Sequence, residues 1–135
     1  ILLEGDAKAR FAERLAMLAK DRPDAEKAAG ALVKLTRPPL AIAVVSHVTG
    51  DKIPAWEQQL SAGAVCAALV NAASAAGFGA NWITDWYAYD AKACAVLGVA
   101  PGEQVAGFIY IGTAADAPLE RVRPDISSLT TVWQG

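Results

Sequence analysis

Residues 52–82 read KIPAWEQQLSAGAVCAALVNAASAAGFGANW, which is a loop, one long helix of small residues, a Gly-Phe-Gly turn and an aromatic side chain. From Leu60 onward this stretch contains no charged residue. A helix that is apolar on every side is typical of a buried environment. We therefore expect a helix over about residues 55–76, ended by Gly77 as its C-cap and buried in a core or a subunit interface.

Two strands and two helices are expected before the long helix. Residues 1–4 form a short apolar strand, and residues 6–19 form a helix with the first of them as its N-cap. A second helix has Pro23 in its first turn and must stop before Pro38. Residues 40–45 are continuously apolar and rich in β-branched side chains, which predicts a central strand covered on both faces.

The segments after the long helix are expected to alternate between strand and helix. Residues 80–84 form a short extended piece, and Asp90 caps a short helix that ends at Gly98. Residues 105–111 form a second central strand, followed by a tail whose last part could add an extended segment to a neighbour. With helices on both faces of a modest sheet, the predicted fold is an α/β sandwich.

The composition predicts one domain with an apolar surface that needs a partner. A chain of 135 residues can bury roughly two thirds of its unfolded surface in a single core. It is 54% hydrophobic and only 19% charged, with a mean hydropathy of +0.28. Surplus apolar surface favours a second subunit that covers it. The net charge of −2 and a pI near 5.3 argue against nucleic acid as a partner.

The cysteine usage and the helix lengths favour a cytoplasmic protein that does not enter a membrane. Cys66 and Cys94 show no framework spacing, which favours free thiols in a reducing compartment. No signal-peptide pattern is present. The apolar part of the long helix is shorter than a membrane span and contains Asn71 and Ser74. Because the chain starts without Met inside an apolar triplet, we expect it to be a fragment that lacks its true N-terminus.

Several kinds of catalytic site can be excluded from the residues alone. The single histidine, His47, has no metal-ligand spacing to either cysteine, and a Ser-His-Asp site would have to use it. The Gly77-Phe78-Gly79 turn follows a helix and has Trp82 where a dinucleotide fingerprint needs its third glycine. No metal ligand and no catalytic side chain is therefore assigned. If the protein is an enzyme, a cofactor must carry the reaction.

The order of these motifs resembles the FMN-dependent nitroreductase family, and most closely its short bacterial branch of NAD(P)H nitroreductases. The resemblance rests on residues 52–63, the small-residue helix, the Gly-Phe-Gly turn and Trp82. Residues 3–6 and residues 105–113 resemble the flanking strands of the family, so nearly the whole chain is covered. The resemblance implies an α+β fold, a three-layer α-β-α sandwich with a central mixed sheet and the long helix buried at a dimer interface.

The family consists of homodimers that hold FMN at two interface sites lined by both subunits. Alanine, glycine and serine in the long helix would let two subunits approach closely. The alternative is that the same helix is the core helix of a monomer. By resemblance, the chain is a flavoprotein oxidoreductase that passes hydride from NAD(P)H through FMN to a small-molecule acceptor, a nitroaromatic, a quinone or a related compound. Two alternatives are a redox-inactive binding or assembly module and another flavin reaction, such as dehalogenation or flavin breakdown.

The resemblance also implies which residues bind the cofactor. The segment Trp82, Ile83 and Thr84 corresponds to the one that runs along the flavin ring, although Trp82 could instead be an ordinary core aromatic. Arg121 and Arg123 resemble a basic pair that contacts the FMN phosphate. Residues two apart in an extended segment project to the same side, so both could converge on one phosphate, with Arg123 expected to contribute more. The alternative is a solvated pair.

Two further positions and one absence complete the comparison with the family. Asp85 stands where many relatives have glycine, and we expect its carboxylate to point away from the ring. Trp56 is expected either to line the substrate pocket or to anchor the loop before the helix. The family's N-terminal Arg-Arg-Ser-type segment and its Pro-containing flavin loop have no counterpart. We therefore expect a single nitroreductase-like domain over residues 1–135 without the N-terminal flavin-binding segment.

Overall fold

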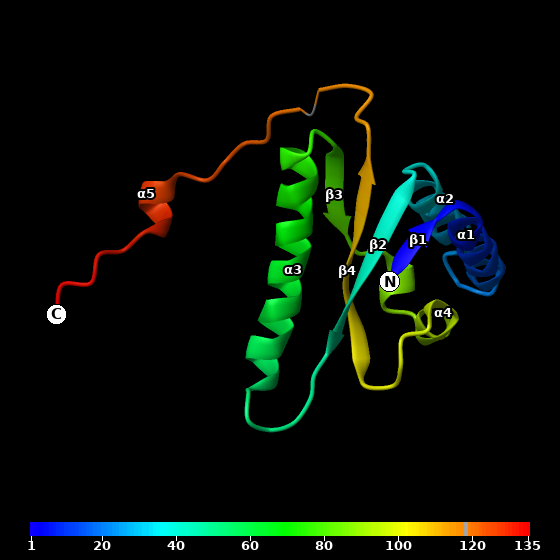
Figure 1. The fold of residues 1–135 in the computed structure, drawn as a ribbon, viewed down its shortest axis with the longest axis horizontal. Coiled ribbons are helices and arrows are strands. Elements are labelled where there is room, and N and C mark those ends of the chain that lie inside the picture. Colours follow the sequence, from blue (N-terminus) through cyan, green and yellow to red (C-terminus); the bar gives the residue numbers. More distant parts are fainter. Residues whose placement is uncertain (118) are drawn as a thin grey trace.

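Four strands form one sheet in the order β1-β2-β4-β3, as seen in a computed structural model that describes residues 1–117 and 119–135 (Figure 1). The elements in chain order are β1 (Leu2–Glu4), α1 (Gly5–Lys20), α2 (Ala25–Thr36), β2 (Leu40–His47), α3 (Ala55–Ala75), β3 (Gly79–Ile83), the short 3₁₀-helix η1 (Trp86–Ala88), α4 (Ala91–Leu97), β4 (Glu103–Gly112) and α5 (Ile126–Leu129). The predicted mixture of helices and strands in an α+β fold is confirmed.

The sheet is antiparallel at every described pairing, so the expectation of a mixed sheet was wrong in this respect. The reason lies in the order of the strands. Helix α3 returns the chain so that β2 and β3 run in the same direction, but β4 lies between them and pairs with both. Two pairs of strands run in the same direction, β2 with β3 and β1 with β4, and each pair is separated by a strand antiparallel to both.

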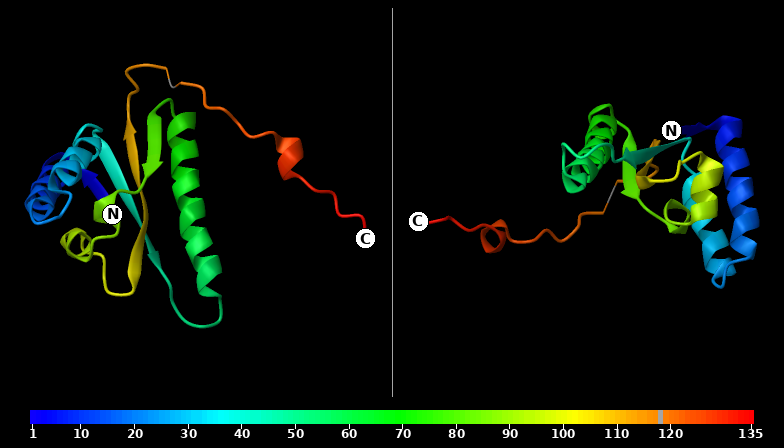
Figure 2. Two further views of the ribbon diagram at one scale, coloured as in Figure 1. Left: turned by 180° about the vertical axis from the view of Figure 1, so that it is seen from behind. Right: turned by 90° about the horizontal axis from the view of Figure 1, so that it is seen from below.

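The helices cover the two faces of the sheet unequally (Figures 1 and 2). Helices α1, α2 and α4 gather on one face, where they build a core with the side chains that β2 and β4 direct toward them. Leu15, Leu35, Tyr87 and Phe108 are among the fully buried members of this core. Helix α3 lies along the other face and contacts β2, β3 and β4. The result is three layers, with α3 alone in the third.

Helix α3 is largely open to solvent in the single chain, and its expected burial at a dimer interface stays a prediction. Only Cys66 and Ala73 are buried, while Trp56, Leu60 and Val65 are exposed. The physical reason is that α3 is covered by the sheet along one side and no described element packs on its opposite side. Because its apolar side chains surround the whole helix, most of them remain exposed in the single chain. Helix α3 thus forms an outer layer on the sheet of the single chain.

Several predicted element ends are confirmed by their capping groups, and others shift by a residue or two. The Asp90 carboxylate accepts a hydrogen bond from the Ala93 N–H at 3.0 Å, and α4 ends at Gly98 with a φ of 87°. Helix α1 begins at Gly5, so Asp6 lies in its first turn and is not the N-cap. Helix α2 begins after Asp24, which places Pro23 ahead of the helix and outside its first turn.

The segment after β4 leaves the body of the molecule. Figures 1 and 2 show it running away from α3 as an extended chain that contains the short α5. Its apolar side chains are strongly exposed; these are Leu119, Val122, Ile126, Leu129, Val132 and Trp133. In the described part of the chain, no helix has the length and apolar character needed to cross a membrane.

Candidate functional site

The indole of Trp82 lies between helix α3 and strand β4. Trp82 is on β3, an edge strand, and its ring extends over the backbone of Gly107 on β4. A Cβ atom at position 107 would overlap the indole nitrogen, so only glycine leaves the ring its place. The far end of the indole lies 3.9 Å from where a Cβ on Gly63 of α3 would stand. Two glycines therefore bound the slot that Trp82 occupies.

A β-bulge in β4 supplies the hydrogen-bond partner of this indole. The register between β2 and β4 pairs Val44 with Gly107 and Val45 with Val105, which leaves Ala106 without a partner in β2. The Trp82 Nε1–H donates to the Ala106 carbonyl oxygen at 3.4 Å. Bulges commonly occur next to functional sites, where they redirect a side chain or a backbone group. Trp82 is still 43% exposed, so the slot opens to the outside.

A cavity of about 330 Å³ lies beside Trp82, between α3, β3 and the C-terminal segment. Trp82 and Arg121, which are far apart in the sequence, both line it. Asn71 and Asn81, which the sequence reasoning missed, also line it. The Asn71 amide belongs to α3, whereas the Asn81 side chain projects to the face of the sheet opposite to Trp82, because residues 81 and 82 are neighbours in β3. Asn71 was noted only as a polar interruption of the apolar helix, and such an interruption on a helix facing a sheet is the signal that could have identified it.

Arg123 does not line this cavity. Its Nε donates to a Glu120 carboxylate oxygen at 3.1 Å, and both side chains are well exposed, at 74% and 82%. An ion pair of this kind in the solvent contributes little stability. The guanidiniums of Arg121 and Arg123, which were expected to converge on one phosphate, thus do not line the same cavity. Arg121 lies with Trp82, and Arg123 is turned to the solvent.

Ile83 and Thr84 do not share the position of Trp82. Ile83 follows Trp82 in the strand and so points to the opposite face of the sheet, where it packs against the core. Thr84 lies beyond the end of β3, and its Oγ1 accepts a hydrogen bond from the Tyr89 hydroxyl at 2.8 Å. Of the three residues predicted along the ring, the structure brings only Trp82 to the cavity beside α3.

The Asp85 carboxylate is turned toward α2. One of its oxygens accepts a hydrogen bond from the Trp86 N–H at 2.8 Å, which caps η1. The other lies 3.1 Å from the Lys34 ammonium. The negative charge of Asp85, directly after residues 82–84, is therefore paired with the Lys34 ammonium of α2.

Trp56 lies in the first turn of α3 and is 67% exposed. Trp56 lines none of the described cavities, and the side-chain hydrogen bonds that hold the loop before the helix come from Gln58. The Gln58 side chain accepts a hydrogen bond from the Thr49 N–H at 2.9 Å and donates to the Ile53 carbonyl oxygen at 2.8 Å. Sequence reasoning missed Gln58, although an amide side chain in the first turn after a loop is a common loop anchor.

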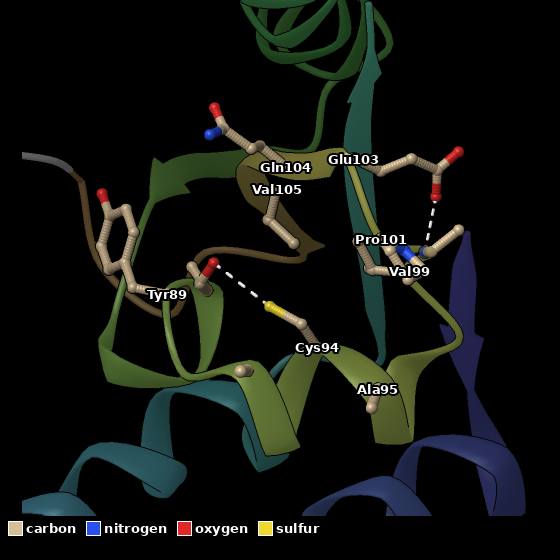
Figure 3. Close-up of a pocket in the computed structure, with 12 residues that line it drawn as sticks. Tyr89, Cys94, Ala95, Val99, Pro101, Glu103, Gln104 and Val105 are labelled. Carbon is tan, nitrogen blue, oxygen red and sulfur yellow. Dashed lines mark hydrogen bonds between the residues drawn. The ribbon is translucent and has the colours of Figure 1, made fainter.

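A second cavity, of about 660 Å³, lies on the opposite face of the sheet between α4 and the start of β4 (Figure 3). The Cys94 thiol points into the region beside Val105 and donates to the Ala88 carbonyl oxygen at 3.5 Å. Burial, and to a lesser degree the nearby Asp90 carboxylate, raises the pKa of this thiol. A thiol that stays protonated is a weak nucleophile, so Cys94 is not assigned a catalytic role.

Comparison with known sequences gives one family. The sequence model described as the Nitroreductase family matches residues 2–113. The "Putative NAD(P)H nitroreductase YdjA" of Escherichia coli K12 is 33% identical over 117 residues, which are 83% of this chain and 62% of that protein. The "Putative NAD(P)H nitroreductase" of Haemophilus influenzae is 34% identical over 82 residues, which are 59% of this chain and 45% of that protein. The chain thus spans less than two thirds of either relative.

Two solved structures share the fold at low sequence identity. A nitroreductase-like family protein from Bacillus cereus superposes with a TM-score of 0.85 at 18% identity. The superposition covers 100% of this chain and 72% of that protein's chain. A BluB-like flavoprotein from Clostridium difficile 630 superposes with a TM-score of 0.64 at 14% identity. This superposition covers 99% of this chain and 78% of that protein's chain. At these identities the structures establish the three-layer fold and nothing about chemistry.

Proposed function

This chain belongs to the nitroreductase family, and we propose that the protein is an NAD(P)H-dependent FMN oxidoreductase that reduces a nitroaromatic, a quinone or a related small acceptor. The relatives named as NAD(P)H nitroreductases support this activity for the intact protein. The proposed location is the cytoplasm. Within the chain, the observation that carries the proposal is the cavity that Trp82 and Arg121 line together.

The residues of this cavity suit part of an FMN molecule. The indole of Trp82 offers an aromatic face beside the open part of the slot. The Asn71 amide can both donate and accept hydrogen bonds, as the edge of a flavin ring requires. Arg121 offers a guanidinium that matches phosphate oxygens in geometry and charge. When bound, FMN would supply the electron and hydride chemistry that the side chains lack.

The side chains have separate tasks in this proposal. Trp82 is held between Gly63 and Gly107, so its ring presents a fixed surface and needs no reordering on binding. Arg121 binds the phosphate end. Asp85 is neutralised by Lys34, so its carboxylate does not place an unpaired negative charge beside the ring. The Thr84 hydroxyl accepts a hydrogen bond from Tyr89 outside the cavity, so Thr84 has no task at the ring.

A second copy of the chain is proposed to complete the site. The outward side of α3 carries Trp56, Leu60 and Val65, and the C-terminal segment carries a further series of exposed apolar side chains. Exposed apolar side chains in this number are typical of an interaction surface in a folded protein. A homodimer would cover both surfaces, and it would place the residues of one copy beside the cavity of the other.

One observation favours the alternative of a binding module without redox activity. Arg123, the member of the basic pair expected to contribute more to phosphate binding, is engaged with Glu120 in the solvent and does not line the cavity. The test is to express the full-length protein and to record its absorbance spectrum and FMN affinity. Flavin absorbance and steady NAD(P)H oxidation with menadione or nitrobenzene support the oxidoreductase. A colourless protein that takes up no FMN would refute it.

A further inference from the structure

The cavity of about 660 Å³ between α4 and the start of β4 is separate from the cavity that Trp82 and Arg121 share (Figure 3). The two cavities have no lining residue in common. They also lie on opposite faces of the sheet, because α4 packs with the core helices and α3 covers the other face. A ligand in the larger cavity would therefore not occupy the proposed flavin site.

Small side chains leave the space between α4 and β4 unfilled. Ala91, Cys94 and Ala95 stand at positions i, i+3 and i+4, so they share one side of α4, and all three line the cavity. On the opposite wall, Val105 directs its side chain toward Cys94 (Figure 3). The volume lies in the range of about 300–1,000 Å³ that is usual for small-molecule sites.

The loop between α4 and β4 borders the cavity and is held by hydrogen bonds at both ends. The Val99 N–H donates to the Cys94 carbonyl oxygen at 3.0 Å, which joins the loop to the end of α4. The Ala100 N–H donates to one oxygen of the Glu103 carboxylate at 2.8 Å. The other oxygen of this carboxylate lies 2.8 Å from Nδ1 of His47 on β2. The cavity is therefore preformed, and binding there needs little reordering of the chain.

The polar side chains at the walls are engaged or directed elsewhere. The Cys94 thiol and the Tyr89 hydroxyl already donate to acceptors of the chain. Gln104 directs its amide away from Cys94 (Figure 3). Glu103 is the one charged residue at the walls among the described residues, and both of its carboxylate oxygens are paired. Water in such a space finds few side-chain partners, so its replacement by apolar atoms is favourable.

We propose that this cavity binds a small neutral aromatic molecule of one or two fused rings, packed between the ring of Tyr89 and the side chains of Val99 and Val105. The Tyr89 ring lines the cavity and is 72% exposed, so it offers an aromatic surface to a second ring. Because the carboxylate of Glu103 is already paired, a charged ligand would lose hydration and gain no partner. The inference does not depend on the proposed redox function.

The experiment is a calorimetric titration of the full-length protein with 2-naphthol at about pH 7, in the presence of saturating FMN. This probe is neutral at that pH, because a phenolic hydroxyl ionises near pH 10. The matched charged probe is 2-naphthoate, which has the same two rings and a carboxylate. We expect saturable binding of 2-naphthol and binding of 2-naphthoate that is weaker by about tenfold or more.

Cys94 reports whether the probe occupies this cavity. Because Cys66 is fully buried, N-ethylmaleimide should modify Cys94 first in the folded chain, and mass spectrometry of the two peptides measures both rates. Saturating 2-naphthol should slow the modification of Cys94 about tenfold by blocking access to the thiol. An unchanged rate of modification would place the probe elsewhere and overturn the inference.

Ala95→Phe introduces a ring into the cavity from an exposed position, so the chain should still fold. It should weaken 2-naphthol binding about tenfold, because the new ring takes the place of the ligand's apolar contacts. The matched control is Ala9→Phe, at an exposed position of α1 outside the cavity, which should change the dissociation constant by less than about twofold. No saturable binding, equal affinity for the two probes, or equal affinity in Ala95→Phe and wild type would each refute the site.

Discussion

The indole of Trp82 occupies the space that a side chain at position 107 would need, and this relationship joins two neighbouring strands to helix α3. The bulge at Ala106 turns a carbonyl toward the indole, and Gly63 of α3 closes the far end of the slot. The position of Trp82 therefore depends on residues from three elements. The first prediction tests this dependence directly.

Gly107→Ala should destabilise the protein by about 1–3 kcal/mol, because its new methyl group overlaps the indole and forces the ring out of its slot. Urea unfolding followed by circular dichroism measures the free energy of unfolding. The matched control is Gly30→Ala on α2, where a Cβ meets nothing within 4 Å. That change should stabilise by about 0.5–1 kcal/mol, as expected for alanine in a helix interior. Equal stability of Gly107→Ala and wild type would contradict the packing.

Arg121→Gln should weaken FMN binding by about 1–3 kcal/mol through loss of a charge-assisted contact to phosphate. Flavin fluorescence quenching in the complete protein measures the dissociation constant. Arg123→Gln should have the smaller effect, since its guanidinium is turned to Glu120 in the solvent. This order reverses the one expected from the sequence, where Arg123 was the stronger candidate. If Arg123→Gln proves the more damaging change, a rearrangement of the C-terminal segment must bring it to the phosphate.

The Asp85 carboxylate should matter more as a cap than as an ion-pair partner. Asp85→Asn keeps an oxygen for the Trp86 N–H and loses only the pair with the partly exposed Lys34, so it should cost at most about 1 kcal/mol. Asp85→Ala loses the cap as well and should cost about 0.5–2 kcal/mol. Thermal unfolding of the two variants provides the comparison. A larger loss in Asp85→Asn than in Asp85→Ala would rule out the capping role.

Stability should fall at alkaline pH because of the buried phenol pair. Burial raises the pKa of Tyr87 from 10.0 to about 12, and burial together with the Tyr87 contact also raises the pKa of Tyr110. A raised folded-state pKa leaves stability unaffected below the unfolded pKa and reduces it as the pH rises from the unfolded toward the folded value. The free energy of unfolding should therefore decline from about pH 10 to about pH 12. Tyr87→Phe should make this decline shallower in urea titrations at each pH, and an unchanged slope would contradict the assignment.

The outward side of α3 should carry the proposed dimer contact. Leu60→Glu places a charge on this apolar surface and should shift the sedimentation coefficient from that of a dimer toward that of a monomer. Met17→Glu is the control, because Met17 is also an exposed apolar residue but lies on α1, across the sheet. It should leave the association state unchanged. A wild-type protein that sediments as a monomer would remove the dimer from the proposal.

Local chemistry explains which elements could be predicted from the sequence. Asp90 and Gly98 define the ends of α4 through a carboxylate cap and a left-handed glycine, and both act on their immediate neighbours. The continuous apolar runs at residues 40–45 and 105–111 give β2 and β4, because helices lie on both faces of these two central strands; the side chains of β2 are buried at alternate positions and half-buried between them. The long helix α3 follows from its composition alone.

Tertiary structure decided the rest, because it depends on contacts between residues far apart in the chain. No local pattern predicts that β4 lies between β2 and β3. This strand order makes the sheet antiparallel and places Gly107 under Trp82. It also takes a folded chain to bring Arg121 to the cavity beside Trp82 and to leave Arg123 outside. The sequence by itself determined the elements and the family to which they belong. Only the packing of those elements decided which of the predicted side chains share a site.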